Sequence, residues 1–154
     1  MSCLGDTQDT TYQMGPNLPL DNGEVYAVVG TLGTRTGNAS YTGVSINESM
    51  QKKGVANIND SQLQDTAREY ADKVRSADKF YVYYITRKCS GLESLTGGHC
   101  LSITESMIPP CPANSGAACG YAKVVQRNYI RPGTQRGPDS KLVLAPRILQ
   151  LQRP

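Results

Sequence analysis

The pattern of hydrophobic and polar positions predicts a series of short strands in the first third of the chain. Val and Tyr alternate with polar residues over 24–32, and turn residues over 33–37 separate this segment from a similar one over 40–47. That spacing is typical of a hairpin, so we expect the two strands to pair. A short edge strand over 52–58 follows.

The hydrophobic period then changes to that of a helix. Apolar side chains recur on one helical stripe at Leu63, Ala67, Tyr70, Ala71 and Val74. Ser61 and Gln64 have the spacing of a capping box at the start of this stripe. The pattern therefore predicts one amphipathic helix over about residues 61–76.

Strand patterning returns directly after the predicted helix. The segment FYVYYITR over 80–87 is apolar or aromatic on both faces, which is typical of a central strand. We expect the alternate set that begins with Phe80 to fill the core, and Tyr81 and Tyr83 to cover the opposite face. Because both faces of this strand are apolar, the face turned away from the core must also be buried, either by the helix or by another subunit.

Three further strands are predicted, over 101–104, 121–131 and 141–151. Pro146 lacks a backbone donor, so the last segment is expected to be an edge strand or an arm. The predicted fold class is mainly β, of the α+β type. It is an antiparallel sheet, sandwich or barrel with one amphipathic helix packed on it.

The length of 154 residues is that of a single domain with a sizeable core. We divide it into an extended acidic arm over 1–23 without regular structure, a β-rich domain over 24–140, and a basic C-terminal edge strand or arm over 141–154. The apolar stretches are shorter than a membrane-spanning helix requires, and the first twenty residues lack the features of a secretory signal. We expect any export signal to precede this numbering.

The net charge of +3 is distributed unevenly. Residues 1–24 carry four acidic side chains and no basic one, whereas residues 121–154 carry seven basic side chains and one acidic one. Ends of opposite sign predict docking on charged partners, including copies of the same chain. An anionic glycan or a nucleic acid is the alternative partner of the basic end.

Four of the five cysteines lie within 31 residues. Three pairings are open, and we favour Cys89 with Cys100 and Cys111 with Cys119, because each pair would close one short loop. A zinc site that includes His99 is an alternative, but the spacing lacks the C-x-x-C element, so no metal is predicted. Reduced, buried cysteines are the other alternative. Disulfides favour an exported protein, whether extracellular, periplasmic or at the cell surface.

Cys3 and three Asn-x-Ser sequons bear on the same compartment. Cys3 is a cross-link, a lipid anchor or a free thiol. The sequons begin at Asn38, Asn47 and Asn59, which are glycosylation candidates. The alternative is that these Asn and Ser residues serve in turns and helix caps.

The sequence contains none of the catalytic motifs that we searched for. It contains no nucleophile elbow, phosphate-binding loop or zinc-protease motif, and its one histidine, His99, lies in a predicted loop. We therefore predict no catalytic residue and no cofactor, and we lean towards a protein that is not an enzyme. A small secreted enzyme that uses His99 or scattered carboxylates is retained as a further alternative.

The candidate binding residues are tyrosines and basic side chains. Nine Tyr against one Phe suits surfaces that are apolar with a polar rim. The set comprises Tyr81, Tyr83, Tyr121, Lys123, Arg127, Tyr129, Arg131, Arg136 and Arg147. Alternation predicts that Lys123, Arg127 and Arg131 share one strand face with two of the tyrosines, as in a stacking and phosphate-binding surface. A charged face that only keeps the strand soluble is the simpler alternative.

From these features we expect an exported, structural or binding subunit that docks on a protein partner or self-assembles through its oppositely charged arms. A glycan-binding or nucleic-acid-binding module is the alternative function.

Overall fold

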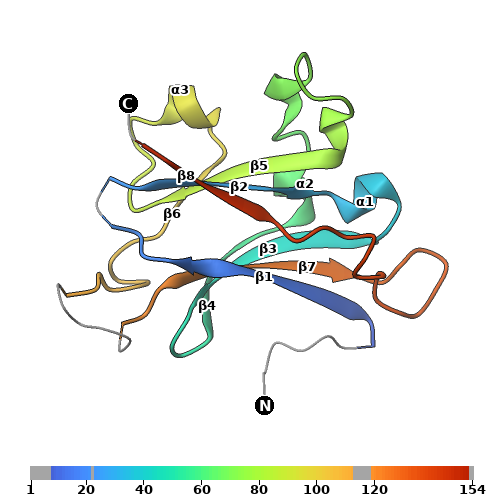
Figure 1. The fold of residues 1–154 in the computed structure, drawn as a ribbon, viewed down its shortest axis with the longest axis horizontal. Helices are drawn as coiled ribbons and strands as arrows, with labels where there is room; N and C mark the ends of the chain where they lie inside the picture. Colours follow the sequence, from blue (N-terminus) through green and yellow to red (C-terminus); the bar gives the residue numbers. More distant parts are fainter. Residues whose placement is uncertain (1–7, 22, 113–118, 153–154) are drawn as a thin grey trace.

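The computed structural model describes residues 8–21, 23–112 and 119–152 (Figure 1). In these residues the chain is mostly β, as the alternation predicted, and its strands form two four-stranded sheets. Neither sheet closes into a barrel. The barrel alternative is therefore wrong.

The first sheet, which we call sheet A, is antiparallel throughout. Its order is β1 (Thr10–Leu18), β7 (Ala122–Tyr129), β3 (Tyr41–Glu48) and β4 (Lys53–Ile58). The central strand β7 is bonded to β1 on one side and to β3 on the other. The edge position predicted for the short strand near residue 52 is confirmed, since β4 ends the sheet.

The second sheet, which we call sheet B, is mixed. Its order is β6 (Cys100–Ser102), β5 (Phe80–Thr86), β2 (Val25–Thr31) and β8 (Arg147–Leu151), and only β5 and β6 run parallel. The predicted central strand is β5, and the predicted C-terminal edge strand is β8, which begins directly after Pro146. In Figure 1, sheet B lies above sheet A.

The main core draws side chains from both sheets. Val28, Tyr81 and Ile85 of sheet B belong to the same buried cluster as Ile46 and Val124 of sheet A. The expectation for the two faces of β5 is reversed, because Tyr81 and its alternates fill this core. The set that begins with Phe80 belongs instead to a second cluster on the other face of sheet B.

The hairpin expected between the first two predicted strands is wrong. β2 belongs to sheet B and β3 to sheet A, so the connection crosses from one sheet to the other. A helical turn, α1 (Gly33–Thr36), makes this crossing, and the Gly33 backbone N–H donates to the Thr42 hydroxyl at 2.8 Å. Gly37 ends the turn with a positive φ, which a glycine adopts without steric cost.

The single helix predicted over 61–76 is replaced by short turns of helix. They are α2 (Asp60–Leu63), η1 (Arg68–Tyr70) and η2 (Ala77–Lys79). A capping box is present, but Asn59 and Gln62 form it, two residues before the predicted pair. The helix stops after Leu63 because Gln64 is extended and Asp65 has a positive φ.

Thr66 gives the physical reason for this interruption. Its hydroxyl accepts a hydrogen bond from the backbone N–H of Val82 at 3.0 Å, and it donates one to the carbonyl of Leu63. The N–H of Val82 points to the side of β5 where β6 pairs further along, at Tyr84. The broken segment therefore satisfies an edge donor of the sheet, which a regular helix with outward side chains would leave unpaired.

The expectation of no regular structure before residue 24 is also wrong. Residues Thr10–Leu18 form β1, which pairs with β7 from Thr10 opposite Tyr129 to Leu18 opposite Ala122. The acidic and basic segments thus meet inside one chain. Pairing extends past the strand ends, since the N–H of Gly137 donates to the carbonyl of Gln8.

Both favoured disulfides are present. Cys89 bonds Cys100 at 2.07 Å, and Cys111 bonds Cys119 at 1.92 Å. The first closes the loop that carries the helical turn α3 (Glu93–Thr96). No helix in the described residues is long and apolar enough to cross a membrane.

Candidate functional site: an apolar groove on sheet B

The outer face of sheet B is apolar across three adjacent strands. Strand register places Ala27 of β2 opposite Tyr84 of β5 on one side and opposite Leu149 of β8 on the other. Val29 lies one step further along the same face, opposite Val82. Because side chains alternate along a strand, these residues share the face that points away from sheet A.

Two segments rise from this face without covering it fully. The broken helical segment 60–79 supplies Ala67, Tyr70 and Val74, and α3 supplies Leu95. In Figure 1 these two segments stand above sheet B on opposite sides, with β5 and β2 running between and below them. They form the two walls of a groove whose floor is the sheet.

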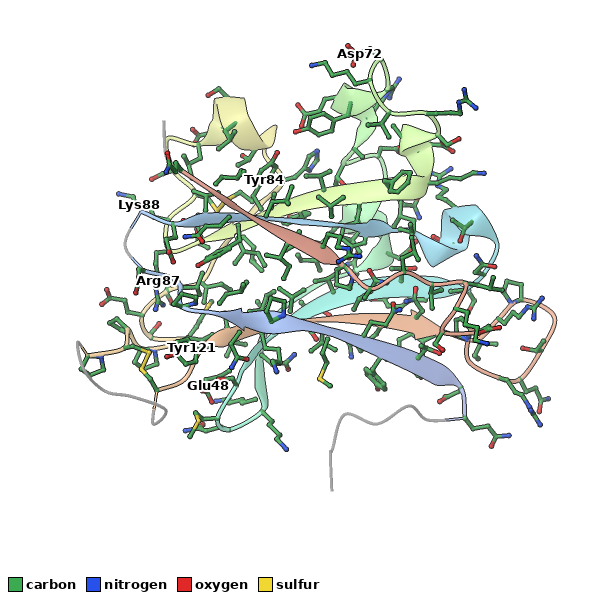
Figure 2. The ribbon with its side chains drawn as sticks, viewed as in Figure 1. Glu48, Asp72, Tyr84, Arg87, Lys88 and Tyr121 are labelled. Carbon is green, nitrogen blue, oxygen red and sulfur yellow. A yellow bond between two sulfur atoms is a disulfide. The ribbon has the colours of Figure 1, made fainter. Side chains whose placement is uncertain are left out.

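The groove has a volume of about 510 Å³, and we call it the sheet B groove. Its described lining consists of Ala27, Val29, Ala67, Tyr70, Val74, Phe80, Val82, Tyr84, Leu95, Leu149 and Leu151. The only polar side-chain atoms in that lining are two tyrosine hydroxyls. Figure 2 labels Tyr84 beneath the two walls, and Asp72 at the outer tip of one of them.

The two hydroxyls are hydrogen-bonded to each other. The Oη atoms of Tyr70 and Tyr84 lie 2.9 Å apart. Burial, then the hydrogen bond to Tyr70 and the nearby Glu69 charge, raise the pKa of Tyr84 above its usual value. The pair holds two protons and its mutual bond uses one, so the accepting hydroxyl keeps a proton for a further acceptor.

Large apolar side chains at the rim remain open to solvent. Leu149 is 54% exposed and Val74 is 41% exposed, although both line the groove. Exposed apolar side chains grouped around a concave apolar surface are typical of a binding site. The arrangement can hold an apolar body and direct one polar group to the tyrosine pair.

The structure divides the predicted basic and aromatic residues among several places. Lys123, Arg127 and Tyr129 share the outer face of sheet A, as alternation predicted. Tyr121 and Arg131 lie just beyond the two ends of β7. Figure 2 shows Tyr121 near Glu48, at the end of sheet A where β4 turns.

The remaining predicted binding residues lie away from that face. Arg136 is exposed in the loop after β7, and Arg147 is exposed at the start of β8 in the other sheet. Tyr81 is fully buried between the sheets, and Tyr83 is half-buried beside His99, with ring centroids 6.1 Å apart. The basic C-terminal segment therefore does not gather into one patch.

The three sequon asparagines have structural contacts of their own. Asn59 caps α2, and the side-chain amide of Asn47 donates to the Ser45 hydroxyl from a buried position. The amide of Asn38 donates to the Leu142 carbonyl. Cys3 lies outside the described residues.

Metal-binding groups do not cluster in the described part of the chain. No three His, Cys, Asp or Glu side chains there are arranged to hold a metal ion. The four described cysteines are all in disulfides.

The sheet B groove was not predicted from the sequence. The signal was present in the 80–87 segment, which is apolar on both faces and so required a second cover. The pattern did not predict the shape of that cover. It predicted a regular helix, which would have closed over the sheet and left no groove.

Comparisons with protein-family models, curated proteins and solved structures found no match.

Proposed function

We propose that this protein is a non-enzymatic, exported binding protein that holds a small apolar molecule in the sheet B groove. The observation that carries the proposal is the groove itself, with its volume of about 510 Å³ and a lining that is apolar except for the Tyr70–Tyr84 pair. Small-molecule sites in proteins are concave, mostly apolar, and commonly of about 300–1,000 Å³, with a few placed polar groups.

The ligand class follows from the lining. A hydrocarbon body of fused rings or a branched chain would bury its surface against Val29, Val82 and Leu149, at roughly 25 cal/mol for each Å² removed from water. One carbonyl or hydroxyl oxygen would accept the remaining proton of the Tyr70–Tyr84 pair. A ligand with a charged group in the groove is disfavoured, since the described lining offers no charged side chain to pair with it.

The scaffold we propose for this site is a two-sheet sandwich. Its support is the shared core and the hydrogen bond from the Tyr81 hydroxyl of sheet B to Gln126 of sheet A. The two disulfides support export to an oxidising compartment.

The first test is binding of N-phenyl-1-naphthylamine, a neutral probe whose fluorescence rises in apolar sites. We expect one probe per chain, and we expect Val29→Phe to weaken binding at least about tenfold, because the larger ring occupies the groove. Val55→Phe is the matched control, since Val55 is also half-buried on a strand but lies on sheet A. Absence of probe binding, or equal weakening by both variants, would overturn the proposal.

The second test concerns the tyrosine pair. A cyclic alcohol or ketone should displace the probe better than the matching hydrocarbon, and the double variant Tyr70→Phe/Tyr84→Phe should remove that difference while keeping the probe's own affinity. Val82→Ala would enlarge the groove and serves as a control for altered shape. If the double variant leaves the preference for oxygenated ligands unchanged, the assigned role of the pair is wrong.

Self-assembly is a second candidate function, which the opposite charges of the two ends predicted. The observation that favours it is the edge position of β8, which carries the exposed Leu149 and follows a segment with the exposed Leu144. An apolar edge strand can pair with a neighbouring chain. Light scattering should then give a mass well above 16.7 kDa. A monomer at every concentration and salt level would contradict this function and leave the groove proposal standing.

A further inference from the structure

A second concave surface lies on the opposite side of the molecule, on the outer face of sheet A. It has a volume of about 450 Å³, and we call it the sheet A groove. Its described lining is Tyr12, Ser45, Asn47, Gly54, Val55, Ala56, Asn57, Val125 and Arg127. We propose that the sheet A groove binds a carboxylated sugar unit of an anionic glycan.

The groove is hollow because small residues occupy the middle of the face. Strand register places the small residue Ser45 of β3 opposite both Val125 of β7 and Asn57 of β4. Gly54 adds no side chain on β4, and the register of β3 and β4 shifts between Ile46 and Asn47. A shift of this kind bends the strand locally, which deepens the concave face.

Arg127 crosses this hollow. Its Nη2 donates to Oδ1 of Asn57 at 2.7 Å, so the side chain of a β7 residue reaches over β3 to β4. Its Nε is buried without a hydrogen-bond partner. The guanidinium is thus anchored at one nitrogen and retains donors that an added acceptor would satisfy.

The charge in the sheet A groove favours an anion. Among the described lining residues, Arg127 alone is charged, and none is acidic. Lys123 follows on the same face of β7, two strand positions beyond Val125. A planar guanidinium matches the two oxygens of a carboxylate in a fork geometry, which makes this anion the natural partner.

The rest of the lining is suited to a sugar ring. Ser45 and Asn57 present hydroxyl and amide groups suited to hydrogen bonds with ring hydroxyls, and the buried Asn47 holds the Ser45 hydroxyl by a hydrogen bond. Val125 forms a buried apolar floor beneath the hollow, and Val55 and Ala56, which also pack against the main core, add apolar atoms to its lining that suit the C–H face of a pyranose. The Tyr12 ring adds an aromatic wall with a polar tip.

A nucleic acid fits this face less well. Arg131 and Arg136, which would extend a track of phosphate contacts, lie off the face in or next to the loop after β7. Tyr129, which alternation offered as a stacking platform, makes an edge contact with Tyr41, with ring centroids 5.4 Å apart. One arginine in the hollow, with Lys123 further along the same strand face, favours one anionic ring over an extended polyanion.

The test is calorimetric titration of the full chain with trigalacturonic acid, compared with neutral galactotriose and with single-stranded oligothymidine. We expect the uronate to bind at least about tenfold more tightly than the neutral sugar. Arg127→Gln should abolish this preference, and Arg127→Lys should restore it in part because it keeps the charge but not the fork. Arg136→Gln is the control, since it removes an equal charge from the exposed loop.

Val55→Phe gives a second, independent variant should Arg127→Gln not fold. It should block the uronate and leave the apolar probe of sheet B bound, whereas Val29→Phe should do the reverse. The proposal is overturned by equal binding of both sugars, by equal losses from Arg127→Gln and Arg136→Gln, or by tighter binding of the oligonucleotide through Arg127. None of these results bears on the sheet B groove.

Discussion

The Tyr81 hydroxyl donates a hydrogen bond to Oε1 of Gln126 at 2.6 Å, between two strands that belong to different sheets. Both residues are fully buried. The amide nitrogen of Gln126 in turn donates to Oε1 of Gln13 at 3.0 Å and to the carbonyl of Leu144 at 3.1 Å. One buried amide therefore ties β5, β1 and the segment before β8 to β7.

The Tyr81→Phe variant tests this link. It leaves Oε1 of Gln126 without its donor inside the core, and we expect the free energy of unfolding to fall by about 1–3 kcal/mol. Urea unfolding followed by circular dichroism measures the change. Tyr129→Phe, on the outer face of sheet A, is the matched control and should stay within about 0.5 kcal/mol of the parent. An equal effect of both variants would show that the bond to Gln126 adds nothing specific.

Alkaline pH should destabilise the protein through its buried tyrosines. Burial raises the pKa of Tyr81 far above the usual value of about 10. The folded state therefore holds this proton more tightly than the unfolded state, so stability is full below about pH 10 and falls as the pH rises above it. Urea midpoints at pH 8 and pH 11 should differ less in Tyr81→Phe than in the parent.

Tyr26 and Tyr84 contribute to the alkaline loss in the same direction. Burial is the largest cause of the raised pKa in both, followed by a hydrogen bond to Glu24 and to Tyr70 respectively. Tyr81→Phe should therefore retain part of the pH dependence. An unchanged dependence would show that Tyr81 ionises only after unfolding from other causes.

Gly30→Ala should be destabilising although the backbone there is extended. A Cβ at this position would overlap the ring and hydroxyl of Tyr81, which is fixed by the core and by Gln126. Overpacking of this kind costs typically about 1–3 kcal/mol. The control is Gly54→Ala on β4, where the Cβ would meet only Oδ1 of Asn47 at 3.4 Å. The melting temperatures of both variants test this prediction. Equal melting temperatures would contradict the overlap with Tyr81 as the cause.

Removal of the Cys89–Cys100 disulfide should affect both stability and ligand binding. The bond spans 11 residues and should contribute about 3 kcal/mol in the chain-entropy description. It also closes the loop that carries α3, whose Leu95 forms one wall of the sheet B groove. The double Ser variant should therefore bind the apolar probe more weakly at a temperature where it is still folded.

The Cys111–Cys119 pair provides the control for that experiment. Its double Ser variant should lose stability without weakening probe binding, because neither residue lines the sheet B groove. If the two double variants weaken the probe alike, the effect belongs to global stability and not to the position of α3.

Local sequence patterns correctly predicted the strands with strong alternation. They failed for segments whose structure depends on contacts with distant parts of the chain. The ranges predicted for β2, β5 and β7 were correct because these strands bury regular sets of side chains. The predicted pairing of β2 with the next strand was wrong because α1 leads the chain from sheet B to sheet A. The hydrogen bond from Gly33 at the start of α1 to Thr42 is not something that loop length and turn residues predict.

The two missed features have similar origins. β1 has the polar residues Thr11 and Gln13 on its inner face and contains Gly15 and Pro16, so its sequence resembles a loop, and only pairing with β7 makes it a strand. The helix over 61–76 was broken because Thr66 bonds Val82 in sheet B. That break leaves the groove open, so the candidate site follows from the feature that the periodicity least predicted.

The pairing of β1 with β7 also limits the order in which the molecule can form. Thr10 meets Tyr129, and in the other sheet Val25 meets Leu151, so each sheet joins segments more than a hundred positions apart in the chain. During synthesis, sheet A cannot be completed before β7 (Ala122–Tyr129) has emerged, nor sheet B before β8 (Arg147–Leu151). Folding dominated by such distant contacts is slow, because the loop must close before the contacts stabilise it. For the export we propose, slow folding of this kind is an advantage, because the chain would stay unfolded longer than one built from local hairpins and its disulfides would form as the sheets assemble.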